Sequence, residues 1–255
     1  FLGRQAMKIF KAPGMSYQEI EKVLGEAVLL SKIGHPNIIR VFDANIFEAQ
    51  DGNFGFFTME HVPGGSLDQF WRSTKSLIPI ATTIDIIIQI CKGVAVGHSE
   101  NPPIVHRDIK PQNILVGYVG DQVCIKVSDF GLAKQVNPLT FYASAKGTMM
   151  FKAPEVFQNP LQDSCAGDVW AIGCILYLLL TNHLPYPDYS SQRSKSFTKS
   201  IDPPSLWNID CDENLDSICM KYLSINPIER FRNANECLYS LATWKHGKDG
   251  TNFST

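Results

Sequence analysis

The stretch HRDIKPQNIL (residues 106–115) brings a carboxylate, an ammonium group and an amide together within a few positions. Asp108, Lys110 and Asn113 follow an apolar pair at positions 104 and 105, so a polar loop comes directly after a buried segment. A surface loop can carry such residues by chance. A site that transfers a phosphoryl group uses all three, because it supplies position and counter-charge rather than covalent chemistry. The stretch alone leaves both interpretations open, and the motifs that follow it decide between them.

The composition of the chain excludes several classes of protein. The 255 residues are 44% hydrophobic, which is enough for a core, and the net charge of −2 offers no basic field for nucleic acid. The longest strongly apolar run, residues 171–180, is about half of a bilayer span, so we expect no membrane insertion within the domain. The first residues do not show a charged and then apolar stretch, so we expect no secretory signal within these residues. Seven scattered cysteines without a C-x-x-C pair predict reduced thiols in a cytoplasmic protein.

Residues 1–61 favour strands around one helix. Short apolar runs at residues 5–10, 41–47 and 54–61 have the length of strands. Ser16 and Glu19 form an S-x-x-E capping box, and apolar residues follow at helical spacing. We therefore expect a helix over residues 17–32, which the Gly-His-Pro sequence at 34–36 ends.

The VPGGSL segment (residues 62–67) marks the clearest break, since proline and two glycines do not continue a strand. Beyond it the pattern turns mainly helical. Apolar residues recur at helical spacing over 84–94, and residues 168–181 are apolar all round, which is typical of a buried helix. Residues 215–222 and 233–245 are amphipathic. We expect a small strand-rich lobe over residues 1–62 and a larger, mainly helical lobe over residues 63–255.

Three further motifs follow the HRDIKPQNIL loop. DFG stands at residues 129–131, KAPE at 152–155 and DVWAIG at 168–173. With these motifs the chain resembles a eukaryotic-type (Hanks-type) serine/threonine protein kinase catalytic domain, from Lys8 to the NPIERF segment at 226–231. The resemblance implies an α+β, protein-kinase-like fold with two lobes. It also implies ATP and Mg²⁺ as cofactors, and a protein substrate with a serine or threonine acceptor.

The resemblance assigns roles to the residues of the loop and of DFG. Asp108 would orient the attacking hydroxyl or accept its proton, and Lys110 would steady the transferred phosphate as a mobile point charge. Asn113 and Asp129 offer the hard oxygen ligands that Mg²⁺ prefers. These four residues form the expected catalytic and metal-binding set.

The resemblance also implies where ATP binds. Lys8, on the first expected strand, matches the lysine that holds the α- and β-phosphates, and Glu26 matches the helix glutamate that pairs with it. Met59, Glu60 and Val62 match the linker between the lobes, whose backbone groups read adenine. This assignment of the linker depends on position in the sequence alone, because backbone recognition needs no particular side chain.

The segment between DFG and KAPE is expected to regulate the site. Thr140 and Ser144 are the expected phosphorylation sites in it, and Arg107, next to the catalytic aspartate, is the natural partner for a phosphate. Thr148 matches the serine/threonine branch of the family. Its hydroxyl is expected to hold the catalytic aspartate and lysine in register.

Other residues of the motifs are expected to be structural. Charged residues are rarely buried unless they are paired, so we expect Glu155 and Arg230 to form a buried ion pair, and Asp168 to be a buried structural partner. His106 and Phe130 are expected to pack and to hold the backbone. Neither is expected to act as an acid or a base.

The N-terminal end departs from the family pattern. The family has a G-x-G-x-x-G-x-V hairpin before the strand lysine, whereas here seven residues precede Lys8 and Gly3 is the only glycine among them. We therefore expect the phosphate-covering loop and its two strands to be absent from these 255 residues. The strand of Lys8 would then lie at the edge of the sheet.

The sequence predicts a serine/threonine protein kinase that uses MgATP, with two alternatives. The first is a pseudokinase or scaffold with the same fold; the missing loop favours it, whereas the intact Lys8, Asp108, Asn113 and Asp129 oppose it. The second is a small-molecule phosphotransferase with a related core. KAPE and the long segment over residues 129–155 disfavour this class, because they resemble a platform for a peptide substrate.

Overall fold

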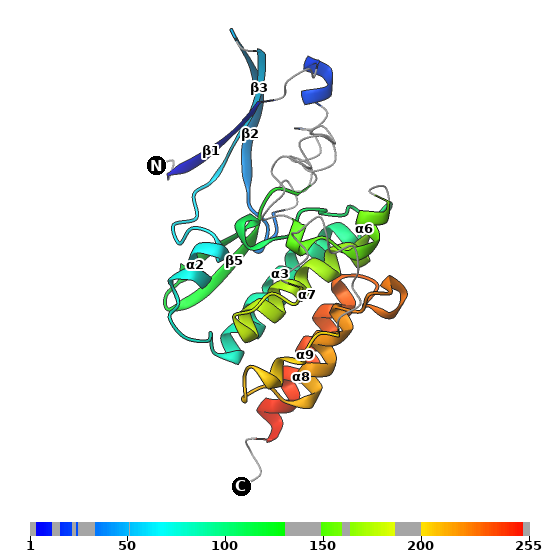
Figure 1. The fold of residues 1–255 in the computed structure, drawn as a ribbon. Helices are drawn as coiled ribbons and strands as arrows, with labels where there is room; N and C mark the ends of the chain where they lie inside the picture. Colours follow the sequence, from blue (N-terminus) through cyan, green and yellow to red (C-terminus); the bar gives the residue numbers. More distant parts are fainter. Residues whose placement is uncertain are drawn as a thin grey trace.

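The chain folds into a small sheet lobe and a larger helical lobe (Figure 1). Three strands lie at one end of the molecule, and the long helices lie together at the other end. This arrangement confirms the two-lobed α+β fold expected from the sequence. The computed structural model describes residues 4–11, 16–21, 24, 34–50, 52–130, 149–159, 164–186 and 200–251.

The small lobe contains an antiparallel sheet of three strands in the order β1-β3-β2. These strands are β1 (Gln5–Lys11), β2 (Val41–Ala49) and β3 (Gly52–Glu60). Lys8 of β1 and Ala44 of β2 both stand opposite Phe57 in the central strand. The three predicted strands are confirmed, with ends shifted by one or two residues, and β1 lies at an edge of the described sheet as expected.

The helix expected over residues 17–32 is described in part. Residues 17–21 and residue 24 are helical. The predicted capping box is confirmed, because the Ser16 N–H donates to Glu19 Oε2 at 2.7 Å and the Glu19 N–H donates to Ser16 Oγ at 3.3 Å. Ile20 and Leu24 are buried against Phe57, so the helix packs on the sheet. Residues 22, 23 and 25–33, including Glu26, lie outside the described residues.

The larger lobe is mainly helical, as expected, but it also contains a hairpin of two strands. Its α-helices are α2 (Leu67–Ser73), α3 (Ile80–His98), α6 (Pro154–Gln158), α7 (Cys165–Thr181), α8 (Glu213–Tyr222) and α9 (Ala234–Thr251). Its strands are β4 (Ile114–Val119) and β5 (Gln122–Val127), and its short 3₁₀ helices are η1 (Pro111–Asn113), η3 (Met149–Phe151), η5 (Pro204–Leu206) and η6 (Pro227–Glu229).

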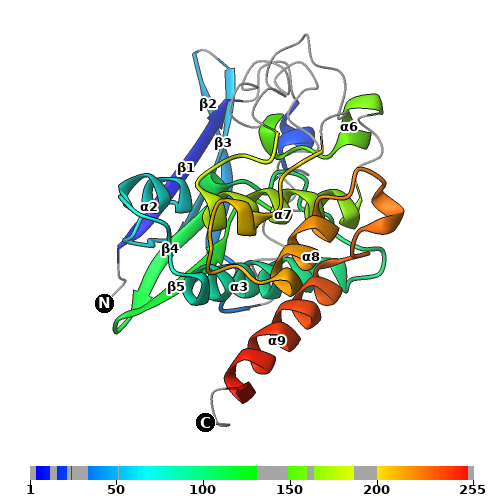
Figure 2. The same ribbon diagram turned by 60° about the horizontal axis from the view of Figure 1, so that its bottom comes forward.

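The β4–β5 hairpin adds two strands, which were not predicted, to the mainly helical lobe beyond residue 62. Its strands pair in register from Ile114 opposite Val127 to Val119 opposite Gln122. Gly120, with φ of 59°, and Asp121 form the turn between the strands, and the left-handed region costs glycine nothing. Figure 2 shows the hairpin beside α2 and α3. Two apolar runs of strand length on either side of a Gly-Asp pair were a readable hairpin signal.

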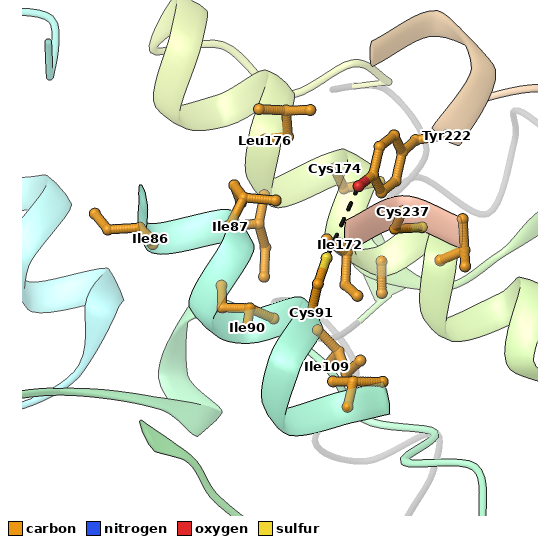
Figure 3. Close-up of a cluster of buried hydrophobic side chains, with 14 of the residues drawn as sticks. Ile86, Ile87, Ile90, Cys91, Ile109, Ile172, Cys174, Leu176, Tyr222 and Cys237 are labelled. Carbon is orange, nitrogen blue, oxygen red and sulfur yellow. Dashed lines mark hydrogen bonds between the residues drawn. The ribbon is translucent and has the colours of Figure 1, made fainter. Parts of the chain in front are cut away.

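Helix α7 runs through the centre of the larger lobe, and every residue from Asp168 to Thr181 is buried. The predicted buried helix is therefore confirmed. Each fully buried isoleucine or leucine in this core contributes about 1.5–3 kcal/mol relative to an exposed one. Figure 3 shows the side chains of α3 and α7 that meet here, together with the contact of 3.8 Å between Cys91 Sγ and Tyr222 Oη. They include Ile86, Ile87, Ile90, Ile172 and Leu176.

The seven cysteines are all described, and none forms a disulfide. Five of them are buried in the larger lobe. Burial raises the pKa of the Cys219 and Cys237 thiols well above the usual value, so both stay protonated and pack as small apolar groups. The expectation of core thiols without disulfides is confirmed for these five, whereas Cys124 and Cys165 are only partly buried.

One helix within the described part of the chain, α3, is long and apolar enough to cross a membrane by length and composition. Of its most apolar window, 56% is buried inside the fold. A central helix of a folded core passes the same test, and α3 packs against β5, α7 and α9. Its apolar character therefore has a sufficient explanation in the packing of the lobe.

Two glycines of α7 predict opposite effects of a methyl group on stability. A Cβ at Gly173 would lie 2.5 Å from Tyr222 Cβ and 3.2 Å from Leu223 Cδ2, whereas a Cβ at Gly167 meets nothing within 4 Å. We expect Gly173→Ala to lower the free energy of unfolding by about 1–3 kcal/mol through overpacking between α7 and α8. Gly167→Ala, the matched control, should be neutral or stabilising by up to about 1 kcal/mol through helix propensity. Urea denaturation measures both, and equal effects would contradict this account of the packing.

Candidate active site

The β4–β5 hairpin fixes the position of two polar loops relative to each other. β4 begins at Ile114, directly after the HRDIKPQN residues, and β5 ends at Val127, two residues before DFG. Because these two residues are paired, Asn113 and Ser128 are held side by side. The Ser128 N–H and Oγ both donate to the Asn113 carbonyl, at 2.9 and 3.0 Å. The hairpin therefore joins the loop of Asp108 to the loop of Asp129.

Asp108, Lys110 and Asn113 form one cluster, as their spacing in the sequence predicted. Lys110 Nζ lies 2.8 Å from Asp108 Oδ2. Asn113 Nδ2 donates to the same Oδ2 at 2.9 Å and to the Asp108 backbone carbonyl at 2.8 Å. About a fifth of the Asp108 and Lys110 side chains is exposed (21% and 18%), so both remain accessible to a substrate. These contacts hold the carboxylate in one orientation at the surface of the loop.

Asp129 brings a second carboxylate to the site. Its backbone has φ of 65°, in the left-handed region that a side chain with Cβ rarely adopts. Lys8 Nζ, from β1 of the small lobe, lies 2.5 Å from Asp129 Oδ2. The other oxygen, Oδ1, is buried and has no hydrogen-bond partner among the residues that the structure describes. The site therefore contains one ion pair between the lobes and one carboxylate oxygen that is ready for a ligand.

Asn113 and Asp129 fit the requirements of a Mg²⁺ ion. The orphaned Oδ1 of Asp129 is a hard oxygen donor, and a buried polar atom without a partner is costly unless something binds it. Both hydrogen bonds of the Asn113 side chain use Nδ2, so the amide oxygen points away from Asp108. Among the described residues, no group of three or more His, Cys, Asp or Glu side chains could hold a metal by itself. Mg²⁺ commonly completes such a site with phosphate oxygens and water.

Asp168, in the buried helix α7, holds the backbone of the HRDIKPQNIL loop. Its Oδ2 accepts hydrogen bonds from the His106 N–H at 2.6 Å and from His98 Nε2 at 3.1 Å, and its Oδ1 accepts from the Arg107 N–H at 2.8 Å. Burial alone would raise the pKa of this carboxyl, but the hydrogen bond from His98 and those from the loop backbone keep it below its usual value. The aspartate therefore stays ionised and fixes Arg107, whose φ is 70°. The expected role of Asp168 as a buried structural partner is confirmed.

His106 connects the two loops from the inside. Its Nε2 donates to the Ser128 carbonyl at 2.8 Å, and its Nδ1 accepts from the Asp108 N–H at 3.3 Å. This pattern requires the neutral ring with the proton on Nε2. The ring centre also lies 4.5 Å from that of Phe130. His106 and Phe130 therefore pack and hold the backbone, as expected, and no proton is available at Nδ1 for catalysis.

The expected adenine linker lies at the end of β3. The Glu60 carboxylate contacts neighbouring parts of the chain: its Oε1 accepts from the Arg40 N–H at 2.8 Å and pairs with Lys126 Nζ at 2.9 Å. Val62 faces β4, where a Cβ at Gly117 would lie 3.3 Å from its Cγ1. The side chain of Glu60 is therefore a structural tether, and its part in binding a nucleotide, like that of Met59 and Val62, stays a prediction about the backbone.

The expected ion pair between Glu155 and Arg230 is confirmed. The guanidinium group binds both carboxylate oxygens, each at 2.8 Å, and its side chain is fully buried. It also donates to the backbone carbonyls of Ser224 and Ile225, at 2.6 and 3.0 Å. Because each carboxylate oxygen of Glu155 has a guanidinium partner, the buried pair holds the KAPE segment against the base of the larger lobe.

Four of the predicted site residues lie in parts of the chain that the structure does not describe. Glu26, Thr140, Ser144 and Thr148 lie outside the described residues, as does the whole segment from 131 to 148.

The sequence did not single out three residues that hold the loops together. Ser128 directly precedes DFG and Lys152 is the first residue of KAPE, which was a usable signal, but a lone histidine at the end of α3 gave none. These three residues are Ser128, Lys152 and His98.

The Asp168 network predicts a large effect of an isosteric substitution. Each carboxylate oxygen of Asp168 accepts a hydrogen bond from a backbone N–H of the loop. Asp168→Asn replaces one of these oxygens by an NH₂ group, which cannot accept a hydrogen bond. At least one buried N–H therefore loses its partner. We expect the free energy of unfolding to fall by about 1–3 kcal/mol, with a matching loss of phosphoryl transfer. Asp85→Asn is the control, because Asp85 is half exposed and pairs only with Lys245 in the described part of the chain. Its effect on stability should stay below about 1 kcal/mol. Urea denaturation of both variants decides the point, and equal losses would contradict it.

Comparison with known proteins agrees with this geometry. A model of the protein kinase domain family matches residues 3–240. The serine/threonine-protein kinase ATG1b of Arabidopsis thaliana is 32% identical over 214 residues, which are 82% of this chain and 29% of that protein. A probable serine/threonine-protein kinase of Clostridium acetobutylicum is 32% identical over 94% of this chain and 36% of its own length, and PknB of Mycolicibacterium smegmatis is 30% identical over 88% and 36%. The chain thus spans about a third of the length of these curated relatives. The family uses ATP and Mg²⁺ and acts on protein hydroxyls, and this chain belongs to the protein kinase domain family.

Proposed function

We propose that this domain transfers the γ-phosphate of ATP to a serine or threonine hydroxyl of a protein. The observation that carries the proposal is the placement of two carboxylates, Asp108 and Asp129, on two loops that the hairpin and Asn113 hold together. One carboxylate is positioned beside a lysine and the other beside a lysine from the opposite lobe. Such a site supplies position and counter-charge, which is what phosphoryl transfer requires.

Each described residue of the cluster has a distinct part in the proposed reaction. Asp108 orients the acceptor hydroxyl and takes up its proton, while Lys110, at 2.8 Å from that carboxylate, offers an ammonium group to the transferred phosphate. Asn113 and Asp129 would hold Mg²⁺, which neutralises charge on the phosphate oxygens when it is bound. Lys8 would release Asp129 and bind the phosphates of ATP once the nucleotide is present.

The nature of the acceptor rests on the relatives and on Lys110. All three relatives reported above are named serine/threonine-protein kinases. Lys110 matches the serine/threonine branch, and it contacts Asp108 directly. Seven unpaired cysteines favour a reducing compartment, so we extend the proposal to the cytoplasm.

A pseudokinase or scaffold is the second candidate, and it would bind nucleotide or partners without turnover. The cluster speaks against it, since a scaffold has no need to orient Asp108 with two side chains. A small-molecule phosphotransferase is a weaker rival, because the Glu155–Arg230 pair anchors the KAPE segment that follows the expected peptide platform.

Incubation of the protein with labelled ATP, Mg²⁺ and a degenerate library of serine- and threonine-containing peptides tests the function directly. Label on serine or threonine supports the proposal. Nucleotide binding without transfer would favour the scaffold, and label on small molecules alone would favour the rival enzyme class.

Two substitutions separate the roles of the two carboxylates. Asp108→Asn should lower kcat by about 100-fold or more, which is the scale of general-base catalysis, and leave ATP affinity nearly unchanged. Asp129→Asn should also weaken Mg²⁺-dependent ATP binding, because it removes a metal ligand. Turnover and calorimetric ATP affinity are measured separately for each variant.

Asp121→Asn is the matched control, because Asp121 is exposed in the β4–β5 turn. This variant should behave like the wild-type protein in both measurements. An unchanged kcat in Asp108→Asn would falsify the role given to that residue.

We further propose that phosphorylation of Thr140 or Ser144 activates the domain through Arg107. A phosphate adds nearly two negative charges and can order a loop against an arginine. Arg107 supports this because its backbone is fixed beside Asp108. We expect Thr140→Ala with Ser144→Ala to abolish an activation that follows preincubation with ATP, and mass spectrometry should locate the phosphate on one of the two residues. Full activity of the double variant would end the idea.

A further inference from the structure

Lys152 is a charged residue in an unusual environment. It lies between the buried residues Phe151 and Ala153, and only 8% of its own surface is exposed. Lysine is almost never buried to this degree unless its ammonium group is paired, because burial of an unpaired charge is costly. The ammonium group of Lys152 donates a hydrogen bond to the backbone carbonyl of Arg107, in the catalytic loop. The KAPE segment is therefore in direct contact with the residue before Asp108.

The contact falls on a residue whose backbone is strained. Arg107 has φ of 70°, and a residue with a Cβ loses about 1–3 kcal/mol in such a conformation unless its surroundings impose it. The Arg107 N–H is held by Asp168 Oδ1 at 2.8 Å. Lys152 holds the other end of the same residue, its carbonyl oxygen. That oxygen belongs to the peptide group that joins Arg107 to Asp108, so Lys152 acts on the peptide plane from which the catalytic side chain projects.

The surroundings of the ammonium group explain why a lysine is tolerated here. Lys152, Asp108 and Asp168 line one small cavity of about 10 Å³. Two acidic residues therefore border the same cavity as the buried lysine. A cavity of this size is at the lower limit for a single water molecule.

We propose that Lys152 is a positioning residue for Asp108: by holding the Arg107 carbonyl, it fixes the peptide plane and hence the direction of the catalytic carboxylate. The proposal rests on the proposed kinase function and extends it to a residue outside the phosphoryl-transfer loop. Asp168 from α7 then binds the N–H of Arg107, and Lys152 from the KAPE segment binds its carbonyl, so both backbone groups of this left-handed residue are held. Because the KAPE segment follows the expected peptide platform, this contact couples the platform to the orientation of Asp108.

The kinetic test compares three variants. Lys152→Met keeps an apolar stem of similar length and removes the ammonium group, so kcat should fall about 10- to 100-fold, the scale of a small misplacement of a reacting group. The KM for ATP should change less than about twofold, since nothing in the contact touches the nucleotide site. Lys152→Arg, which can still donate to the carbonyl, should recover most of kcat. Lys245→Met is the matched control, because Lys245 is part of an exposed pair with Asp85 and should leave kcat and KM unchanged.

A purely structural role for Lys152 makes a different prediction. It would lower the melting temperature and the amount of active protein, with kcat per folded molecule unchanged and no recovery in Lys152→Arg beyond that of stability. That result, or a wild-type kcat in Lys152→Met, would overturn the proposal. If Lys152→Met does not fold, Lys152→Gln takes its place, because its shorter side chain withdraws the donor from the carbonyl while it keeps a polar end.

A second measurement does not depend on turnover. Hydrogen exchange of the peptide that covers residues 104–110 should be faster in Lys152→Met than in the wild type, and it should return towards the wild-type rate in Lys152→Arg. If the wild-type protein transfers no phosphate, the proposed function fails, but the exchange data still decide whether Lys152 holds the loop. Unchanged exchange in Lys152→Met would refute the positioning role even in an active enzyme.

Discussion

The site depends on one buried carboxylate, that of Asp168. It lies in a helix whose surroundings are almost entirely apolar, where an ionised group persists only if hydrogen bonds replace water. The donors that replace water are two backbone N–H groups of the catalytic loop and the ring of His98, which in turn accepts from the first N–H of α9. Burial makes an ionised carboxylate unfavourable unless these donors are present. The loop must therefore keep the conformation that brings its N–H groups to Asp168. Removing either side of this arrangement leaves unsatisfied groups in the core.

The β4–β5 hairpin is the second constraint on the site, because it fixes the position of the two loops relative to each other. The pairing of Ile114 with Val127 fixes the distance between the chain that leaves the HRD loop and the chain that enters DFG. Ser128 and His106 then tie the loops together through backbone carbonyls, so the relative position of Asn113 and Asp129 does not depend on flexible side chains. Two residues with hard oxygen donors, which would suit a metal, are thereby held by sheet geometry, which is more rigid than a surface loop alone.

The sequence predicted the fold well where local signals and packing agree. The three strands of the small lobe, the Ser16–Glu19 capping box and the buried helix over residues 168–181 all have strong periodic or capping signals, and all are present. The hairpin over residues 114–127 was not predicted, because its apolar runs directly follow the HRDIKPQNIL motif and lie within a mainly helical part of the chain. Its Gly-Asp turn was visible in the sequence. The pairing of Lys8 with Asp129 was not, because contacts between lobes have no local signature.

The site shows the same division between residue identity and residue geometry. Motif spacing indicated Asp108, Lys110 and Asn113 as one cluster, but no spacing could reveal that Arg107 and Asp129 adopt left-handed backbones. Such strain costs about 1–3 kcal/mol at each residue and exists only where tertiary contacts impose it. The contacts at Arg107 come from α7 and from the KAPE segment, which are 61 and 45 residues away in the chain. The geometry of the phosphoryl-transfer loop is thus a property of the folded lobe, and the motif alone would not adopt it.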